Sequence, residues 1–252
     1  MDMDQDYSVK SLARAMRVLE CFSVQQPELG VTEIAKMLGM QKSTICNILS
    51  TFEKTGYVVQ NAQTSKYHLG TKILHLSYIV NHHLGLRDIF LPYLHRIAEE
   101  AREACYFGIL SNDEVLYIEA VYPSSQQQTR NILGERAPLY CTGLGKAMLA
   151  HMPPEEAERI ICGELRPYTT FTLCDPMVLR DHLDEIRRNG YAVDNMEHEF
   201  GVRCVAAPVF GANGQVMAAV SVSGPSPRFD HNTVVKHAEL ITRTLQPLQR
   251  CL

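Results

Sequence analysis

The sequence predicts an α+β protein with two domains. Its 252 residues are more than a single domain of roughly 100–200 residues usually holds, and 46% of them are hydrophobic, which is enough for a sizeable core. Up to about residue 70, apolar residues recur at three- and four-residue steps, as in amphipathic helices. From about residue 104, several segments are rich in β-branched and aromatic residues, which indicates strands.

The first two predicted helices cover residues 8–24 and 31–38. The buried face of the first helix is predicted to contain Leu12, Ala15, Met16, Leu19 and Phe22. Pro27 and Gly30 separate the two helices. Thr32 is predicted to be the N-cap of the second helix. The buried side of that helix is predicted to contain Ile34, Ala35 and Leu38.

The third predicted helix covers residues 42–54, ends at Gly56, and is followed by a hairpin. Its predicted buried face contains Ile45, Ile48, Leu49 and Phe52. Residues 57–60 and 66–69 are short β segments around a polar loop. Three short helices followed by a hairpin predict a winged helix-turn-helix domain over residues 8–70.

Residues 71–102 are predicted to form a helical linker between the domains, interrupted near Gly85 and Pro92. One side of its first part carries Ile73, Leu76, Ile79 and Val80. We expect this apolar side also to provide a contact between copies of the chain.

Residues 103–252 are predicted to form the second domain, with one antiparallel sheet and helices packed around it. The predicted strands are 105–110, 115–122, 203–210 and 216–223. The predicted helices lie around 143–151, 154–162, 176–189 and 231–248.

Composition and charge argue against several classes of protein. No run of 18 apolar residues occurs, and the acidic start MDMDQD is unlike a secretory signal, so we expect a cytoplasmic protein without a membrane span. None of the eight cysteines forms a C-x-x-C pair, so neither a zinc ribbon nor a disulfide framework is predicted, and no cofactor is expected.

The net charge is −4, yet residues 8–70 carry seven Lys and Arg against four Asp and Glu. This asymmetry suits a chain of which one end meets phosphate.

The amino-terminal domain offers polar and cationic side chains for contact with DNA. The predicted DNA-binding residues are Ser11, Arg14, Lys42, Ser43, Thr44, Asn47 and Lys66. In the first turns of the third helix, Lys42 can meet a phosphate or a guanine and Asn47 can contact adenine with two hydrogen bonds, while the two hydroxyls can donate to phosphates. Lys66 in the wing, together with Ser11 and Arg14 in the first helix, is predicted to contact the DNA backbone. Any three-helix bundle with a polar surface would show a similar pattern.

Segments in both halves of the chain resemble the IclR family of bacterial regulators. In the amino-terminal half these are SVKSLARAMRVLE, VTEIAKMLGMQKSTICNILSTFEKTGYV and KYHLG. In the carboxy-terminal half, PLYCTGLGKAMLA resembles the signature around the family's effector loop, GYAVDNMEHEFGVRCVAAPVF its second signature, and VMAAVSVSGP its last core strands. The motifs agree in order and spacing from about Ser8 to the final helix.

The resemblance implies a transcription regulator that binds operator DNA and a small-molecule effector. It implies a GAF-like second domain, a homodimer formed through the first domains, and a homotetramer formed through the second ones. The effectors of the family are organic acids, aromatic acids or sugar-derived metabolites, and both repressors and activators occur in it. We predict a repressor of a catabolic operon, controlled by an organic acid or a sugar acid.

The resemblance also implies the position of the effector site. The residues that match it are Thr142, Gly143, Leu144, Asp194, Cys204, Ser221 and Ser223. Glycines let backbone N–H groups approach a carboxylate where a helix begins, and the i, i+2 spacing of the two serines puts both on one strand face. Without the resemblance, the sequence favours an ordinary helix start at the glycine loop, the serines could face solvent, and Cys204 could be a small buried apolar residue.

Three other functions remain open at this point. Cys204, His198 and Asp194 could form a nucleophilic triad, although no oxyanion motif accompanies them. The cysteines and histidines could serve a metal or redox sensor, although His82-His83 is an isolated pair and the cysteines lack ligand spacing. The second domain could act in assembly alone. No catalytic residue and no metal ligand are predicted.

Overall fold

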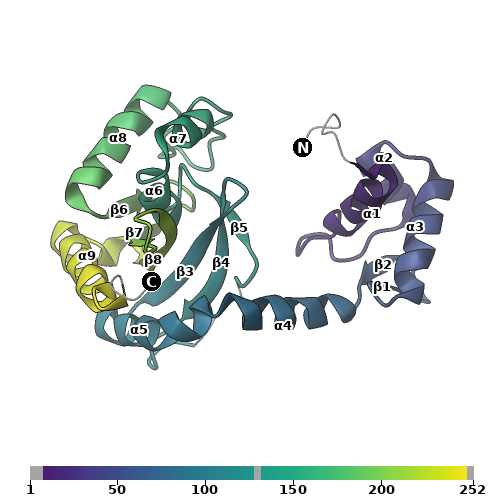
Figure 1. Cartoon of the computed structure of the whole chain (residues 1–252), viewed down its shortest axis with the longest axis horizontal. Helices are drawn as coiled ribbons and strands as arrows, with labels where there is room; N and C mark the ends of the chain where they lie inside the picture. The colour runs from purple at the N-terminus through teal and green to yellow at the C-terminus, as the bar shows by residue number, and fades with distance from the viewer. Residues whose placement is uncertain (1–7, 128–131, 249–252) are drawn as a thin grey trace. The chain divides into compact units, whose positions relative to one another are not determined.

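A computed structural model describes residues 8–127 and 132–248 of the chain (Figure 1). The chain divides into two compact units, Met1–Gly85 and Leu86–Leu252. Each unit has its own hydrophobic core, as expected of separate domains. Among the residues described, no helix is both long and apolar enough to cross a membrane.

The first unit is built from short helices and one hairpin. Its elements are α1 (Lys10–Glu20), α2 (Val31–Leu38), α3 (Lys42–Lys54), β1 (Val58–Gln60), β2 (Tyr67–Leu69) and α4 (Lys72–Leu84). The bounds of α2 and α3 are those predicted, and Ile34, Ile45 and Leu49 are fully buried as their spacing indicated. β1 and β2 pair antiparallel, which confirms the predicted hairpin.

The predicted buried face of the first helix is partly wrong. Leu12 and Met16 are 60% and 48% exposed, whereas Val18, which the prediction left out, is completely buried. Leu19 and Phe22 pack only partly against the core. The helix carries apolar residues on more than one side, and the packing of α2 and α3, rather than its own period, decides which side is covered.

Thr32 is not the N-cap of α2. The N-cap is Gly30, which has an extended backbone, and its N–H donates to Glu33 Oε2 at 2.6 Å. Glu33 therefore satisfies the start of the helix from inside its first turn, as in a capping box, and Thr32 already lies within the helix.

The predicted linker of residues 71–102 divides at Gly85, which has a φ of 61° between α4 and α5 (Leu86–Ala101). Helix α5 buries Phe90 and Leu94 and belongs to the second unit. Pro92 does not interrupt it. The carbonyl that loses its N–H partner to this proline is that of Asp88, an exposed residue in the first turn, so the loss is tolerated.

The second unit holds one antiparallel sheet of six strands in the order β5-β4-β3-β8-β7-β6. The strands are β3 (Ala104–Ser111), β4 (Glu114–Val121), β5 (Arg136–Pro138), β6 (Ala192–Asn195), β7 (Val202–Phe210) and β8 (Val216–Pro225). The four strands predicted from composition are β3, β4, β7 and β8. The short edge strands β5 and β6 were not predicted, because three or four residues carry too little periodicity.

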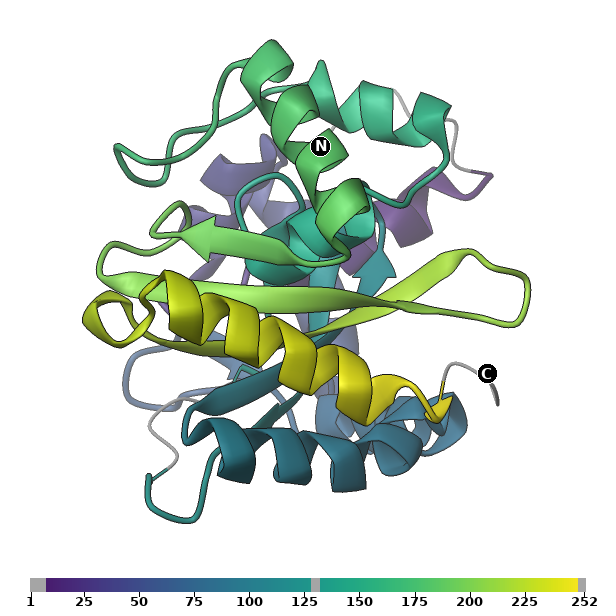
Figure 2. The ribbon, with the colours of Figure 1, turned by 90° about the vertical axis from the view of Figure 1, so that its left-hand side faces the viewer.

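Helices cover both faces of this sheet. They are α5, α6 (Gly143–Leu149), α7 (Pro154–Ile161), α8 (Pro176–Asn189) and α9 (His231–Leu245), with a short 3₁₀ helix at Ser226–Arg228. α5 and α9 lie side by side on one face (Figure 2). The buried helix α6 packs on the other face and shares a core with α7 and α8. The predicted α+β architecture is confirmed.

Candidate functional site

The predicted DNA-binding residues of α3 form an exposed surface at the start of that helix. Lys42, Ser43, Thr44 and Asn47 are all exposed, while the opposite side of the helix is anchored in the core by Ile45 and Leu49. Gln41 precedes the helix with an extended backbone, and no side chain caps the first amides. The start of α3 therefore presents free amide donors and a cationic side chain together, which is the chemistry of phosphate recognition.

The other three predicted contacts lie outside α3. Ser11 and Arg14 are exposed on α1. Lys66 is the last residue of the hairpin loop, directly before β2, and its ammonium group forms an ion pair with Glu33 Oε1 at 3.0 Å. Any contact between Lys66 and a phosphate would compete with this pair.

All seven predicted effector-binding residues line one cavity of about 490 Å³ in the second unit. A cavity of this size is in the usual range for small-molecule sites. Thr142, Gly143 and Leu144 come from the start of α6, and the other four residues come from three adjacent strands, β6, β7 and β8. Segments about 80 residues apart in the chain therefore meet at this cavity.

Close contacts shape the cavity wall around Gly143. A Cβ atom on Gly143 would lie 3.3 Å from Cys204 Cβ, so this glycine allows α6 to approach β7. Cys204 Sγ lies 2.8 Å from Ser223 Oγ. Thr142 caps α6: its hydroxyl accepts from Gly145 N–H at 3.0 Å and donates to Pro138 O at 2.9 Å. The predicted set of free amides at the glycine loop is thus reduced, because the Gly145 N–H is already bound.

Burial controls the charge of the cavity. It raises the pKa of Asp194 to about 7, although Lys146 and the backbone N–H of Glu197 act in the opposite direction. Two guanidinium groups line the cavity, and both are held by carboxylates: Arg228 by Glu103 at 2.5 Å and Arg136 by Glu114 at 3.3 Å. Because these cations are already paired, a ligand in the cavity meets hydroxyl groups, the carboxyl group of Asp194 and two further acidic side chains, Glu135 and Glu199.

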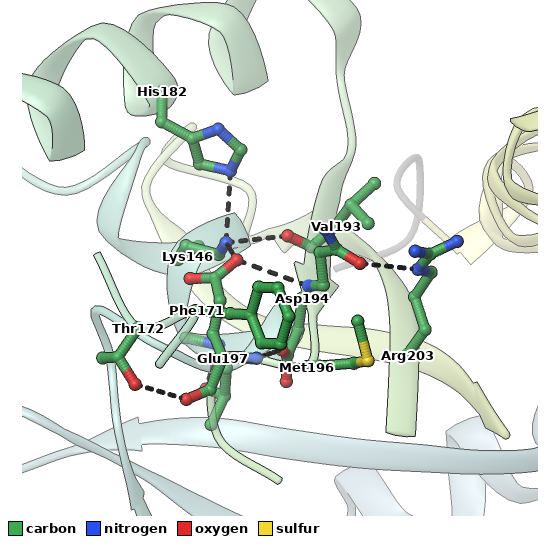
Figure 3. A network of polar contacts seen from close by, with 12 residues as sticks. Lys146, Phe171, Thr172, His182, Val193, Asp194, Met196, Glu197 and Arg203 are labelled. Carbon is green, nitrogen blue, oxygen red and sulfur yellow. Dashed lines mark hydrogen bonds and ion pairs between the residues drawn. The ribbon is translucent and has the colours of Figure 1, made fainter. Parts of the chain in front are cut away.

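Sequence reasoning missed two groups of residues at this site. Tyr106, Tyr117 and Tyr122 line the cavity, and the ring of Tyr106 is roughly perpendicular to each of the other two. Tyr106 lies opposite Ser221 in the sheet, a register that the sequence does not state. The second group surrounds Lys146, which lies in the GLGK motif but was not among the residues predicted for the effector site. It is completely buried, does not line the cavity, and bonds Glu197 (Figure 3).

The burial of Cys204 argues against the nucleophilic triad. Burial raises the pKa of the Cys204 thiol well above its ordinary value, so the thiolate that a nucleophile needs is scarce at neutral pH. In the described part of the chain, no cluster of three or more His, Cys, Asp or Glu side chains could hold a metal ion. The side chains of His82 and His83 lie outside the described residues.

Comparison with known proteins gives the same picture along the whole chain. The family described as "IclR helix-turn-helix domain" matches residues 11–62, and "Bacterial transcriptional regulator IclR C-terminal" matches residues 78–249. The chain is 32% identical to the HTH-type transcriptional regulator XynR of Escherichia coli, over 97% of both chains. It is 28% identical to the transcriptional repressor IclR of the same organism, over 93% of this chain and 87% of that one.

A solved structure is also similar. It is that of an IclR homolog from Microbacterium hydrocarbonoxydans complexed with 4-hydroxybenzoate, with a TM-score of 0.77 and 26% identity over 94% of this chain and 99% of that one.

Proposed function

The chain belongs to the IclR family of bacterial transcriptional regulators, and on this premise we propose that it represses a catabolic operon and releases operator DNA when a small organic acid or sugar acid binds. It is a transcriptional regulator with a DNA-binding helix-turn-helix and an effector domain. The observation that carries the effector proposal is that seven residues chosen from the sequence meet in one cavity.

The DNA contact is assigned to the start of α3. Lys42 and the amides of the first turn would hold phosphates, and Asn47, one turn further on, would reach a base edge in the major groove. Ser11 and Arg14 of α1 are proposed as backbone contacts, because they are exposed and polar. These contacts would give an affinity that falls steeply with salt, since each neutralised phosphate releases counterions.

The cavity suits a small acid that is held mainly by neutral donors. The hydroxyl groups of Ser221 and Ser223 line it, and protonated Asp194 can donate a hydrogen bond to a carboxylate. The similar protein from Microbacterium hydrocarbonoxydans was solved with 4-hydroxybenzoate, which is such an acid. Repression is supported by the similar E. coli protein that is named a repressor. The effector would act by binding the DNA-free arrangement of the domains more tightly than the DNA-bound one.

We also propose that the protein works as a dimer or tetramer of identical chains. Leu12 and Met16 on α1, and Leu74 and Ile79 on α4, are large apolar side chains left exposed in a single chain. Exposed apolar surface of this kind marks contacts between proteins. Sedimentation velocity over a range of concentrations tests the proposal: a species with the mass of one chain at every concentration would contradict it.

The function is tested by binding of the purified protein to the DNA upstream of its own gene. Fluorescence anisotropy at several salt concentrations, with and without a panel of organic acids and sugar acids, should give tight and salt-sensitive binding that one compound weakens. Scrambled DNA of the same length is the control. Equal affinity for both DNAs at every salt concentration would contradict operator binding at this site, and specific binding that no compound changes would contradict the acid effector.

A further inference from the structure

Lys146 is a fully buried cation that the effector proposal leaves without a role. It lies on α6, one turn after the residues that line the cavity, but it does not line the cavity itself. Its ammonium group reaches across to β6 and α8 (Figure 3). A buried charge is costly unless all its hydrogen bonds are made, so its partners indicate what it does there.

The ammonium group carries three N–H donors, and three acceptor atoms surround it. It donates to Val193 O at 2.7 Å, to His182 Nε2 at 3.1 Å, and to Glu197 Oε1. Burial, and secondarily the charge of Lys146, lower the pKa of His182 to about 4. The ring is therefore neutral at pH 7, and its Nε2 can accept the hydrogen bond.

Glu197 belongs to the β6–β7 turn (residues 196–201), which supplies His198 and Phe200 to the cavity wall. The Glu197 N–H also donates to Asp194 Oδ1 at 2.8 Å, and the His198 backbone bonds the same carboxyl group, so the turn orients it. One hydrogen-bonded chain therefore runs from Lys146 through Glu197 to a residue of the cavity.

The backbone of the β6–β7 turn is strained at one residue. Met196 has a φ of 61°, which costs a residue with a side chain on the order of 1–2 kcal/mol. Such a conformation persists only where surrounding contacts impose it. Thr169 Oγ1 donates to Met196 O at 2.7 Å and Thr172 Oγ1 to Glu197 O at 2.6 Å, while Lys146 holds the side chain of Glu197.

We propose that Lys146 is a positioning residue of the effector cavity. Its ammonium group binds the β6–β7 turn to α6 and thereby sets the distance between two walls: Thr142 and Gly143 on one side, Asp194 and His198 on the other. The residue acts through Glu197 and touches no effector. The proposal rests on the proposed function only in calling this cavity the effector site.

The test removes both charges and keeps the side-chain volumes. Lys146→Met with Glu197→Gln avoids leaving either charge buried alone. Hydrogen exchange of the full-length protein should become at least about tenfold faster in peptides covering the β6–β7 turn, while β8 exchanges as in the wild type. The control variant, Arg159→Met with Asp113→Asn, removes an exposed ion pair of 2.7 Å in the same unit and should change neither segment.

A second measurement uses Cys204 as a reporter inside the cavity. Its thiolate attacks the sulfenyl sulfur of methyl methanethiosulfonate, forming a methyl disulfide and expelling methanesulfinate. Labelling of Cys204, followed by peptide mass spectrometry, should be at least about tenfold faster in the double variant if the wall has opened. Cys105, completely buried in the same sheet, should react at its wild-type rate.

The results separate positioning from a general structural role. If hydrogen exchange in β8 and labelling of Cys105 also become faster, the whole unit is loosened. If exchange at the turn and labelling of Cys204 keep their wild-type rates, Lys146 does not hold the wall. Either result overturns the proposal. If the double variant does not fold, Glu197→Asp, which keeps the charge but shortens the side chain, should give a smaller but still selective acceleration, and its absence would have the same meaning. Neither measurement involves DNA or an effector, so this proposal and the proposed function can fail separately.

Discussion

In the first unit the candidate binding residues of α3 lie within six consecutive positions and are exposed, whereas in the second unit they come from four elements and line the inside of a cavity. DNA is large, so an exposed helix anchored by two core residues, Ile45 and Leu49, is enough to present a reading surface. A small ligand must be enclosed, and enclosure buries polar groups such as Asp194 and Ser221. Recognition by an exposed surface therefore depends on residues that are close together in the sequence, whereas an enclosed cavity depends on residues that are far apart in it.

The largest expected effect is a gain in the free energy of unfolding on Asp194→Asn, which tests the burial of this side chain in the second unit. The folded-state pKa of about 7 lies above the ordinary 3.8, so the folded protein loses stability as pH rises from about 4 to about 7 and does not regain it above 7. Asn carries no charge and can still accept the Glu197 N–H. At about 1.4 kcal/mol per pKa unit, the variant should be more stable than the wild type by up to about 4 kcal/mol at pH 8 and by almost nothing near pH 4. Urea unfolding at both pH values measures this, and a gain that does not depend on pH would contradict it.

The next effect tests how tightly the second unit is packed around the start of α6. A Cβ on Gly145 would lie 2.5 Å from both Cα and O of Leu139, which are backbone atoms that cannot move aside cheaply. Gly145→Ala should therefore destabilise the second unit by about 3 kcal/mol in urea unfolding. Gly211→Ala is the control, because its nearest neighbour is the Asn213 side chain at 3.3 Å. Hydrogen exchange of α3, in the first unit, should be the same in the Gly145→Ala variant as in the wild type. Equally faster exchange in both units would show that they do not unfold independently.

A smaller effect tests the reading surface itself. Asn47 is exposed and makes its proposed contact with one base pair, so Asn47→Ala should lose about 1–3 kcal/mol of discrimination at that position alone. Affinities for operators changed one base pair at a time measure this. If the variant loses the same affinity on every operator, Asn47 does not read a base.

The smallest effect concerns a single phosphate. Lys42→Ala should weaken binding to all DNA sequences alike and reduce the slope of log K against log salt by about 0.9, the value for one lost phosphate contact. Lys54→Ala removes the same charge at the other end of α3 and serves as the control. Equal changes in slope for the two variants would show that the effect comes from net charge and not from the position of Lys42.

The local elements could be predicted closely from the sequence. The helical period gave the bounds of α2 and α3, and composition located β3, β4, β7 and β8. The seven cavity residues came from the resemblance to a family, not from their pattern. The buried face of α1 and the place of α5 could not be predicted, because both depend on which neighbour covers the helix.

What the sequence by itself determined is the order of the longer elements, the exposed polar start of α3 and the membership in the family. Only the tertiary structure decided that Tyr106 lies opposite Ser221, that Lys146 holds Glu197, and that burial raises the pKa of Asp194 to about 7. The reason is physical. Periodicity and turn chemistry act between residues a few positions apart, whereas strand register, desolvation and ion pairing arise between residues that meet only after the chain has folded.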